Sequence, residues 1–124
     1  MTHMTIFPLL AIGATSWIAV QGGAWQPGQE TLGQIQSNLE PLVTSQLNAQ
    51  HKKSRIKFAD YTFQYQGQQS IGRKYVLVNA FCRKPEGDLT KDFYFVFDGG
   101  LCFFHVKYDP STKEFYEFEF NGAG

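Results

Sequence analysis

The chain of 124 residues is long enough to bury one core without disulfides or metals, and it has the length of a single domain. Hydrophobic residues make up 43% and charged residues 18% of it, which excludes an intrinsically disordered protein. Lys plus Arg and Asp plus Glu both number 11, so no net charge attracts nucleic acid or an anionic membrane, and we expect no nucleic-acid partner.

Residues 1–24 contain a mostly apolar run from Ile6 to Val20. This run is too short for a stable membrane span but matches the hydrophobic region of a signal peptide. Small residues follow it, so cleavage after Gly22 or Ala24 is one prediction, which places the mature protein in the periplasm or outside the cell. The first five residues lack Lys and Arg. The alternative is therefore an N-terminal apolar segment that packs on the domain, with a cytoplasmic location left open.

A helix is predicted in the next segment because Leu32, Ile35, Leu39, Leu42, Val43 and Leu47 recur at spacings of three and four. We expect this apolar face to be buried against a sheet. Thr31 with Gln34 fits a capping box at the helix start. Pro41 removes a backbone donor and crowds the preceding turn, so a kink or two abutting helices are expected there.

After residue 55 the hydrophobic period changes to two, which is typical of strands. Five strands are predicted at 56–66, 73–83, 92–98, 101–108 and 114–121. The connections are short, so strands adjacent in sequence are expected to pair. The predicted fold is α+β: residues 25–124 form one domain, in which an N-terminal helix packs on a five-stranded antiparallel meander.

The strand register follows from Gly99-Gly100, which is interpreted as a two-residue hairpin loop. It would pair Phe97 with Cys102, Phe95 with Phe104 and Phe93 with Val106. The next hairpin would pair Phe104 with Phe118 and Val106 with Tyr116. The predicted core face carries Val76, Val78, Ala80, Cys82, Phe93, Phe95, Phe97, Cys102, Phe104, Val106, Tyr116, Phe118 and Phe120. Because strand 92–98 would separate Cys82 from Cys102, both are predicted to be reduced thiols.

The opposite, outer face of this sheet is mixed in character. It combines polar residues with enough aromatic and aliphatic side chains to suggest an interaction surface, unless residues 6–20 cover it. The candidate binding residues on this face are Tyr75, Phe81, Tyr94, Phe103, His105 and Phe115.

Motifs for phosphate loops, serine hydrolases, zinc proteases and redox cysteines are absent from the sequence. The scattered Cys and His residues predict no metal site, and no cofactor is expected. One row, Phe81, Tyr94, His105 and Glu117, is laterally aligned in the predicted register. Tyr94, His105 and Glu117 are therefore candidates for an acid/base site. The favoured interpretation is that His105 and Glu117 form a cross-strand polar pair without a catalytic role.

A helix followed by an antiparallel meander resembles the cystatin-like and nuclear-transport-factor-like α+β folds over about residues 29–121. The resemblance is architectural, since the Gln-x-Val-x-Gly signature of cystatins is absent. The segment from Asp98-Gly99-Gly100 to Asn121-Gly122 also resembles the end of small uncharacterised bacterial secreted proteins. The first functional hypothesis is a non-enzymatic extracytoplasmic binding or inhibitor-type module that contacts a protein partner. The alternatives are a small enzyme and a homodimer through the sheet face.

Overall fold

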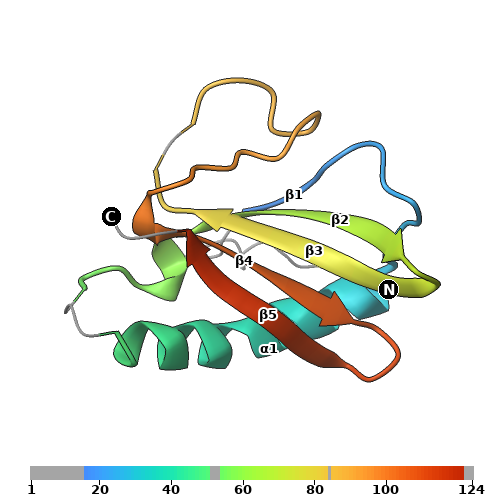
Figure 1. The fold of residues 1–124 in the computed structure, drawn as a ribbon, viewed down its shortest axis with the longest axis horizontal. Coiled ribbons are helices and arrows are strands. Elements are labelled where there is room, and N and C mark those ends of the chain that lie inside the picture. The colour runs from blue at the N-terminus through green and yellow to red at the C-terminus, as the bar shows by residue number, and fades with distance from the viewer. Residues whose placement is uncertain (1–15, 51–53, 84, 122–124) are drawn as a thin grey trace, which may run out of the picture.

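The computed structural model describes residues 16–50, 54–83 and 85–121 as one helix packed on a five-stranded sheet (Figure 1). The strands occur in the order β1 (Trp17–Ala19), β2 (Thr62–Ser70), β3 (Arg73–Phe81), β4 (Gly100–Asp109) and β5 (Glu114–Asn121). Helix α1 (Gln29–Asn48) and the short 3-10 helix η2 (Phe58–Asp60) lie between β1 and β2 in the chain. The predicted α+β class is confirmed. The sheet is mixed rather than wholly antiparallel, because β1 runs parallel to β2.

Helix α1 buries the predicted face. Ile35, Leu39 and Val43 are fully buried, and they pack in one core with Phe63 and Val76 of the sheet. The predicted capping box is wrong, because the helix starts at Gln29 with Gly28 as its N-cap residue.

The helix runs through Pro41 as one element, so two abutting helices do not form. Pro41 lies on the exposed side of α1, as does Ser37. Pro41 has no backbone N–H to donate to the carbonyl of Ser37. Because this carbonyl is on the exposed side of the helix, it can bond to water instead.

The predicted strand at 92–98 does not form, and β3 pairs directly with β4. Residues 85–99, which we call the strap, instead cross the outer face of the sheet, opposite α1 (Figure 1). Phe93, Phe95 and Phe97 alternate as in a strand, but they lie in the strap and not on the core face, and Phe97 is 96% exposed. The Gly99-Gly100 hairpin and the three pairs derived from it are therefore wrong.

The disulfide between Cys82 and Cys102 closes the base of the strap. The prediction of reduced thiols is wrong, because it assumed a strand between the two cysteines. With β3 and β4 adjacent, their Cα atoms lie 5.0 Å apart, within the range that a disulfide bridges. Closing a loop with a sequence separation of 20 stabilises a fold by about 3 kcal/mol through the unfolded chain.

Cys102, which was predicted on the core face, is buried with Phe81 and Phe103 instead, and most of the other predicted residues do lie on the core face. Val76, Val78, Ala80, Phe104 and Val106 are buried there, and Phe118 and Phe120 pack against them. The core also includes residues that the prediction did not place in it: Tyr61, Phe63 and Tyr108.

The register of β5 with β4 differs from the prediction by one residue at the turn, and a bulge in β5 shifts it by one more. Phe104 pairs with Phe120 and Lys107 with Tyr116, so the predicted pairs of Phe104 with Phe118 and Val106 with Tyr116 are wrong. Glu117 has a φ of 54°, and the extra residue reverses the faces of the residues that precede it. Phe115 therefore packs on Tyr108 in the core, and Tyr116 lies on the outer face.

Residues 16–25 form the edge of the sheet. Trp17 stacks on Phe63 with ring centroids 4.3 Å apart, and the amides of Val20 and Ala24 donate to β2. The backbone of Trp25 bridges to Gly67, where any side chain would collide with it. Cleavage after Gly22 or Ala24, one of the two predictions for this segment, would remove β1. Residues 1–15 lie outside the described residues.

We expect a chain that starts at Trp25 to be at least about 3 kcal/mol less stable than one that starts at Ser16, because removing Trp17 uncovers Phe63. Urea unfolding followed by circular dichroism measures the difference. Equal unfolding midpoints for the two chains would contradict a structural role for β1.

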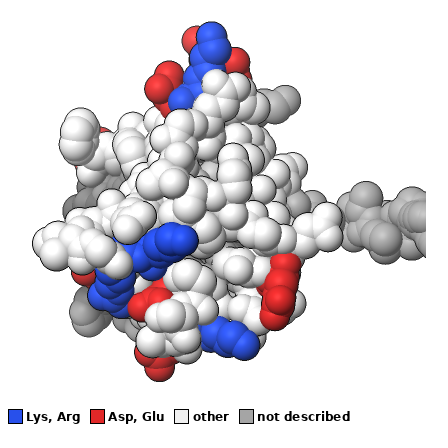
Figure 2. Space-filling model, turned by 90° about the vertical axis from the view of Figure 1, so that its right-hand side faces the viewer, with Lys and Arg blue, Asp and Glu red and all other residues white. Residues whose placement is uncertain are grey.

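Charged side chains are dispersed over the face shown in Figure 2, where basic and acidic groups lie near one another with uncharged surface between them. This face is the end of the sheet at which the β2–β3 and β4–β5 turns lie (Figure 1). The arrangement agrees with the balanced composition of the chain.

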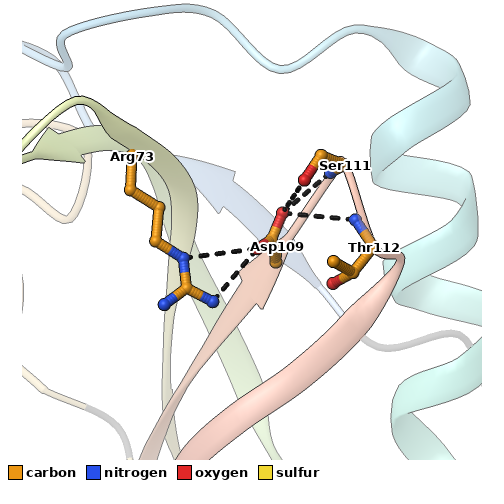
Figure 3. Close-up of polar contacts among 4 residues, drawn as sticks. All are labelled: Arg73, Asp109, Ser111 and Thr112. Carbon is orange, nitrogen blue, oxygen red and sulfur yellow. Dashed lines mark hydrogen bonds and ion pairs between the residues drawn. The ribbon is translucent and has the colours of Figure 1, made fainter.

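Asp109 organises the turn between β4 and β5 (Figure 3). Its Oδ1 accepts hydrogen bonds from the amide and the hydroxyl of Ser111, each at 2.8 Å, and from the Thr112 amide. Its Oδ2 pairs with the guanidinium of Arg73 at 3.0 Å. The Ser111 hydrogen bonds, with help from Arg73, lower the pKa of Asp109 to about 2. This cluster is a structural anchor that joins β3 to the turn.

We expect the Asp109→Asn variant to be less stable at neutral pH and to approach the original protein as the solution is acidified. The folded pKa of about 2 lies below the value of about 3.9 for an unfolded chain. The stabilising contribution is therefore complete above about pH 4 and is lost as the pH falls towards 2. Urea midpoints between pH 2 and 6 measure this, with Glu114→Gln as the control. A difference independent of pH would contradict it.

Candidate functional site

Two buried amide side chains hold the strap on the sheet. Gln64 of β2 and Asn79 of β3 are fully buried, and the Asn79 amide donates to Gln64 Oε1 at 3.1 Å. Gln64 also donates to the carbonyls of Leu89 and Asp92 and accepts a bond from the Tyr94 amide. The Asn79 amide donates to the Tyr94 carbonyl at 2.9 Å. These bonds occupy strap backbone groups that a strand would have used in a ladder.

A second, smaller core lies beneath the strap. Phe81, Cys102 and Phe103 are buried in it, and Leu89, Tyr94 and Val96 of the strap pack against them. The absence of a side chain at Gly99 gives room to the ring of Phe103, because a Cβ there would overlap the ring. The disulfide, the amide pair and this core together fix the strap at its base and its middle.

We expect Gln64→Ala to release the strap while the main core stays folded, because it removes three bonds to strap backbone groups. A loss of about 1–3 kcal/mol is typical for a buried polar group left without its partner. In the variant, the hydrogen-exchange rate of the Tyr94 amide should rise at least about tenfold more than the rates of the β3 amides rise, each measured against the original protein. The exposed Gln69 of the same strand supplies the control, Gln69→Ala. Unchanged exchange at Tyr94 would show that the amide pair does not hold the strap.

Between the strap and strands β3–β5 lies a cleft of about 370 Å³. Its walls are mostly apolar, with three polar side chains at one side. The lining residues are Leu77, Phe95, Val96, Phe97, His105, Glu119, Phe120 and Asn121. The cleft therefore combines an apolar body with a few convergent polar groups, as small-molecule sites commonly do.

His105 is the centre of the polar side of the cleft. Its Nδ1 lies 3.1 Å from Asn121 Oδ1, and its Nε2 lies 3.3 Å from a carboxylate oxygen of Glu119. Both ring nitrogens thus face oxygen acceptors, which fixes the plane of the imidazole. The His105 side chain is 32% and that of Glu119 71% exposed, so the pair remains accessible from the cleft.

The predicted pairing of His105 with Glu117 is wrong. The bulge places Glu119 opposite His105, and Glu117 instead forms an ion pair with Lys107 at 2.9 Å. The hydrogen bond to Glu117 raises the pKa of Lys107. The actual row across the outer face is Gln64, Asn79, His105 and Glu119.

The other predicted site residues are dispersed. Phe81 and Phe103 lie beneath the strap, and the ring of Tyr94 packs on both of them. Tyr75 lies on the outer face, where it donates to Gln68 and contacts Lys107. Phe115, which was placed on the outer face, lies in the main core. Tyr94, His105 and Glu117 are held in separate contacts and do not form a common acid/base site.

Sequence reasoning found His105 but missed its partners Glu119 and Asn121. It also assigned Phe95 and Phe97 to the buried face, whereas they form one wall of the cleft. A signal for the strap was present in the polar residues Gln64 and Asn79. Asn79 stands in an apolar run of β3, and a buried amide there must find partners. Here those partners are Gln64 and a backbone carbonyl of the strap.

Within residues 16–50, 54–83 and 85–121, no group of three or more His, Cys, Asp or Glu side chains is placed to hold a metal ion.

In the same part of the chain, no helix is both long and apolar enough to cross a membrane.

Comparison with known proteins gave no family model, no curated protein and no solved structure that matches this chain. The resemblance to cystatin-like and nuclear-transport-factor-like folds stays a prediction. The site must therefore be interpreted from its own geometry.

Proposed function

We propose that this protein is a non-enzymatic, extracytoplasmic binding module and that the cleft between the strap and the outer sheet face is its ligand site. The observation that carries the proposal is the cleft itself. Its size of about 370 Å³ lies within the range of sites for small organic molecules. The buried amides and the disulfide form its wall in advance, so a ligand need not order the strap on binding.

The disulfide supports a location outside the cytoplasm. Disulfides persist in the periplasm and outside the cell, whereas cytosolic thiols are usually kept reduced. Cys82 and Cys102 join the strap base to the sheet, so the cleft wall depends on an oxidising compartment. A leader that ends before Ser16 would preserve β1 and agree with export.

A small enzyme is the second candidate function. Its support is the oriented imidazole of His105, which contacts both Glu119 and Asn121. The cleft lining lacks a Ser, Thr, Cys or Lys that could serve as a nucleophile.

A homodimer through the outer face is the third candidate, supported by the exposure of Phe97 beside the cleft. Ligand binding needs no group beyond those that line the cleft, whereas the other two functions do, and we therefore prefer it.

The neutral fluorescent probe N-phenyl-1-naphthylamine tests the proposal. We expect its emission to rise on addition of the protein and Leu77→Trp, which fills the cleft, to abolish the increase. Tyr75→Trp, on the same face of the same strand, is the matched control and should leave probe binding unchanged.

Equal probe binding by the original protein and the Leu77→Trp variant would contradict the cleft as a ligand site. Light scattering must be recorded alongside. If probe emission depends on protein concentration and follows a monomer–dimer equilibrium, the homodimer would replace the binding proposal.

A further inference from the structure

We infer that the cleft selects a small organic cation, an amine carried on an aromatic or alkyl body, over neutral and anionic molecules of the same shape. This inference rests on the proposed function and specifies its ligand class. It depends on three features of the cleft: the sign of its charge, the placement of its aromatic rings and the orientation of its one carboxylate.

The charge of the lining favours a cation. Glu119 is the only carboxylate among the lining residues, and the lining contains no Lys or Arg. An anionic ligand would meet this carboxylate with no lysine or arginine in the lining to balance it.

Two cations of the outer face, Lys107 and Arg73, are engaged elsewhere. Lys107 is paired with Glu117 and lies over the ring of Tyr75. Arg73 is paired with Asp109 and stacks on the ring of Tyr116 at 4.2 Å. Neither the Lys107 ammonium nor the Arg73 guanidinium is therefore free to pair with Glu119, whose one polar contact among the described residues is His105.

Aromatic rings frame the same space. Phe95 and Phe97 of the strap are 52% and 96% exposed and line the cleft, and Phe120, whose ring packs on Phe104 in the core, is also among the lining residues. The ring of Phe95 is held by stacking on Phe93, with centroids 5.4 Å apart. An ammonium group near ring faces gains cation–π attraction, and the rings pack equally well on the apolar body of the ligand.

The orientation of Glu119 completes the site. His105 contacts Oε1 of Glu119 and is itself oriented by Asn121. Among the described residues Glu119 has no other polar partner, so its second carboxylate oxygen can accept a hydrogen bond from a ligand. A charge-assisted bond from an ammonium group to that oxygen is stronger than one from a hydroxyl group. His105 is a positioning residue for this carboxylate.

Three probes of matched shape test the inference: 3-phenylpropylamine, 3-phenylpropanol and 3-phenylpropionate. Each is titrated into the isotopically labelled protein, and affinity is taken from amide shifts of Leu77 and His105. We expect the amine to bind at least about tenfold more tightly than the alcohol and the acid. Glu119→Gln should reduce amine affinity to that of the alcohol. Glu119→Asp, which keeps the charge, should retain most of the preference, and Glu114→Gln on the same strand should change nothing.

The possible results separate the two proposals. If no probe shifts these amides, the cleft is not a ligand site and the proposed function fails. If the alcohol or the acid binds there as tightly as the amine, the cleft stands as a binding site but the inferred ligand class is wrong. If the amine binds equally well after Leu77→Trp or Glu119→Gln, its binding is nonspecific and the inference is again overturned.

Discussion

The hydrogen-bonded pair of Gln64 and Asn79 is the interaction on which the rest of the outer face depends. Both amides are fully buried, and their hydrogen bonds are made within the protein, although Asn79 Oδ1 has no partner among the described residues. Their partners are backbone groups of a strap that leaves the sheet after β3 and returns at β4. Because the strap departs here, β3 and β4 become neighbours, the two cysteines meet, and a cleft forms where the strap ends.

Much of the fold could be predicted from the sequence because its main core follows regular periods. The buried face of α1 and the alternation along β3 and β4 both indicated the correct core residues. The strap could not be predicted in this way, since Phe93, Phe95 and Phe97 alternate as a strand would. The conformation of the strap depends on the burial of two distant amides, and such long-range hydrogen bonds cannot be inferred from a local sequence pattern.

The candidate site, like the fold, could be predicted only in part. His105 was identified because the pairing of β4 with β3 is regular around it. Glu119 was missed because the β4–β5 turn and the bulge each shift the pairing by one residue from the predicted register. A positive φ is expected at glycine or asparagine, and Glu117 is neither, so the sequence gives no sign of the bulge. A shift of register changes which side chains face each other across a sheet. The register at the turn and the bulge at Glu117 together gave His105 the wrong partner.

The same bulge interrupts an exposed edge of the sheet. In the described residues the sheet ends at β1, which has only three residues, and at β5, whose ladder is interrupted at Glu117. Short or irregular strands are poor surfaces for the addition of a further strand. Glu114, Glu117 and Glu119 would also bring negative charges together if two β5 edges met. A sheet rich in phenylalanine is in this way protected at both margins against growth into fibrils.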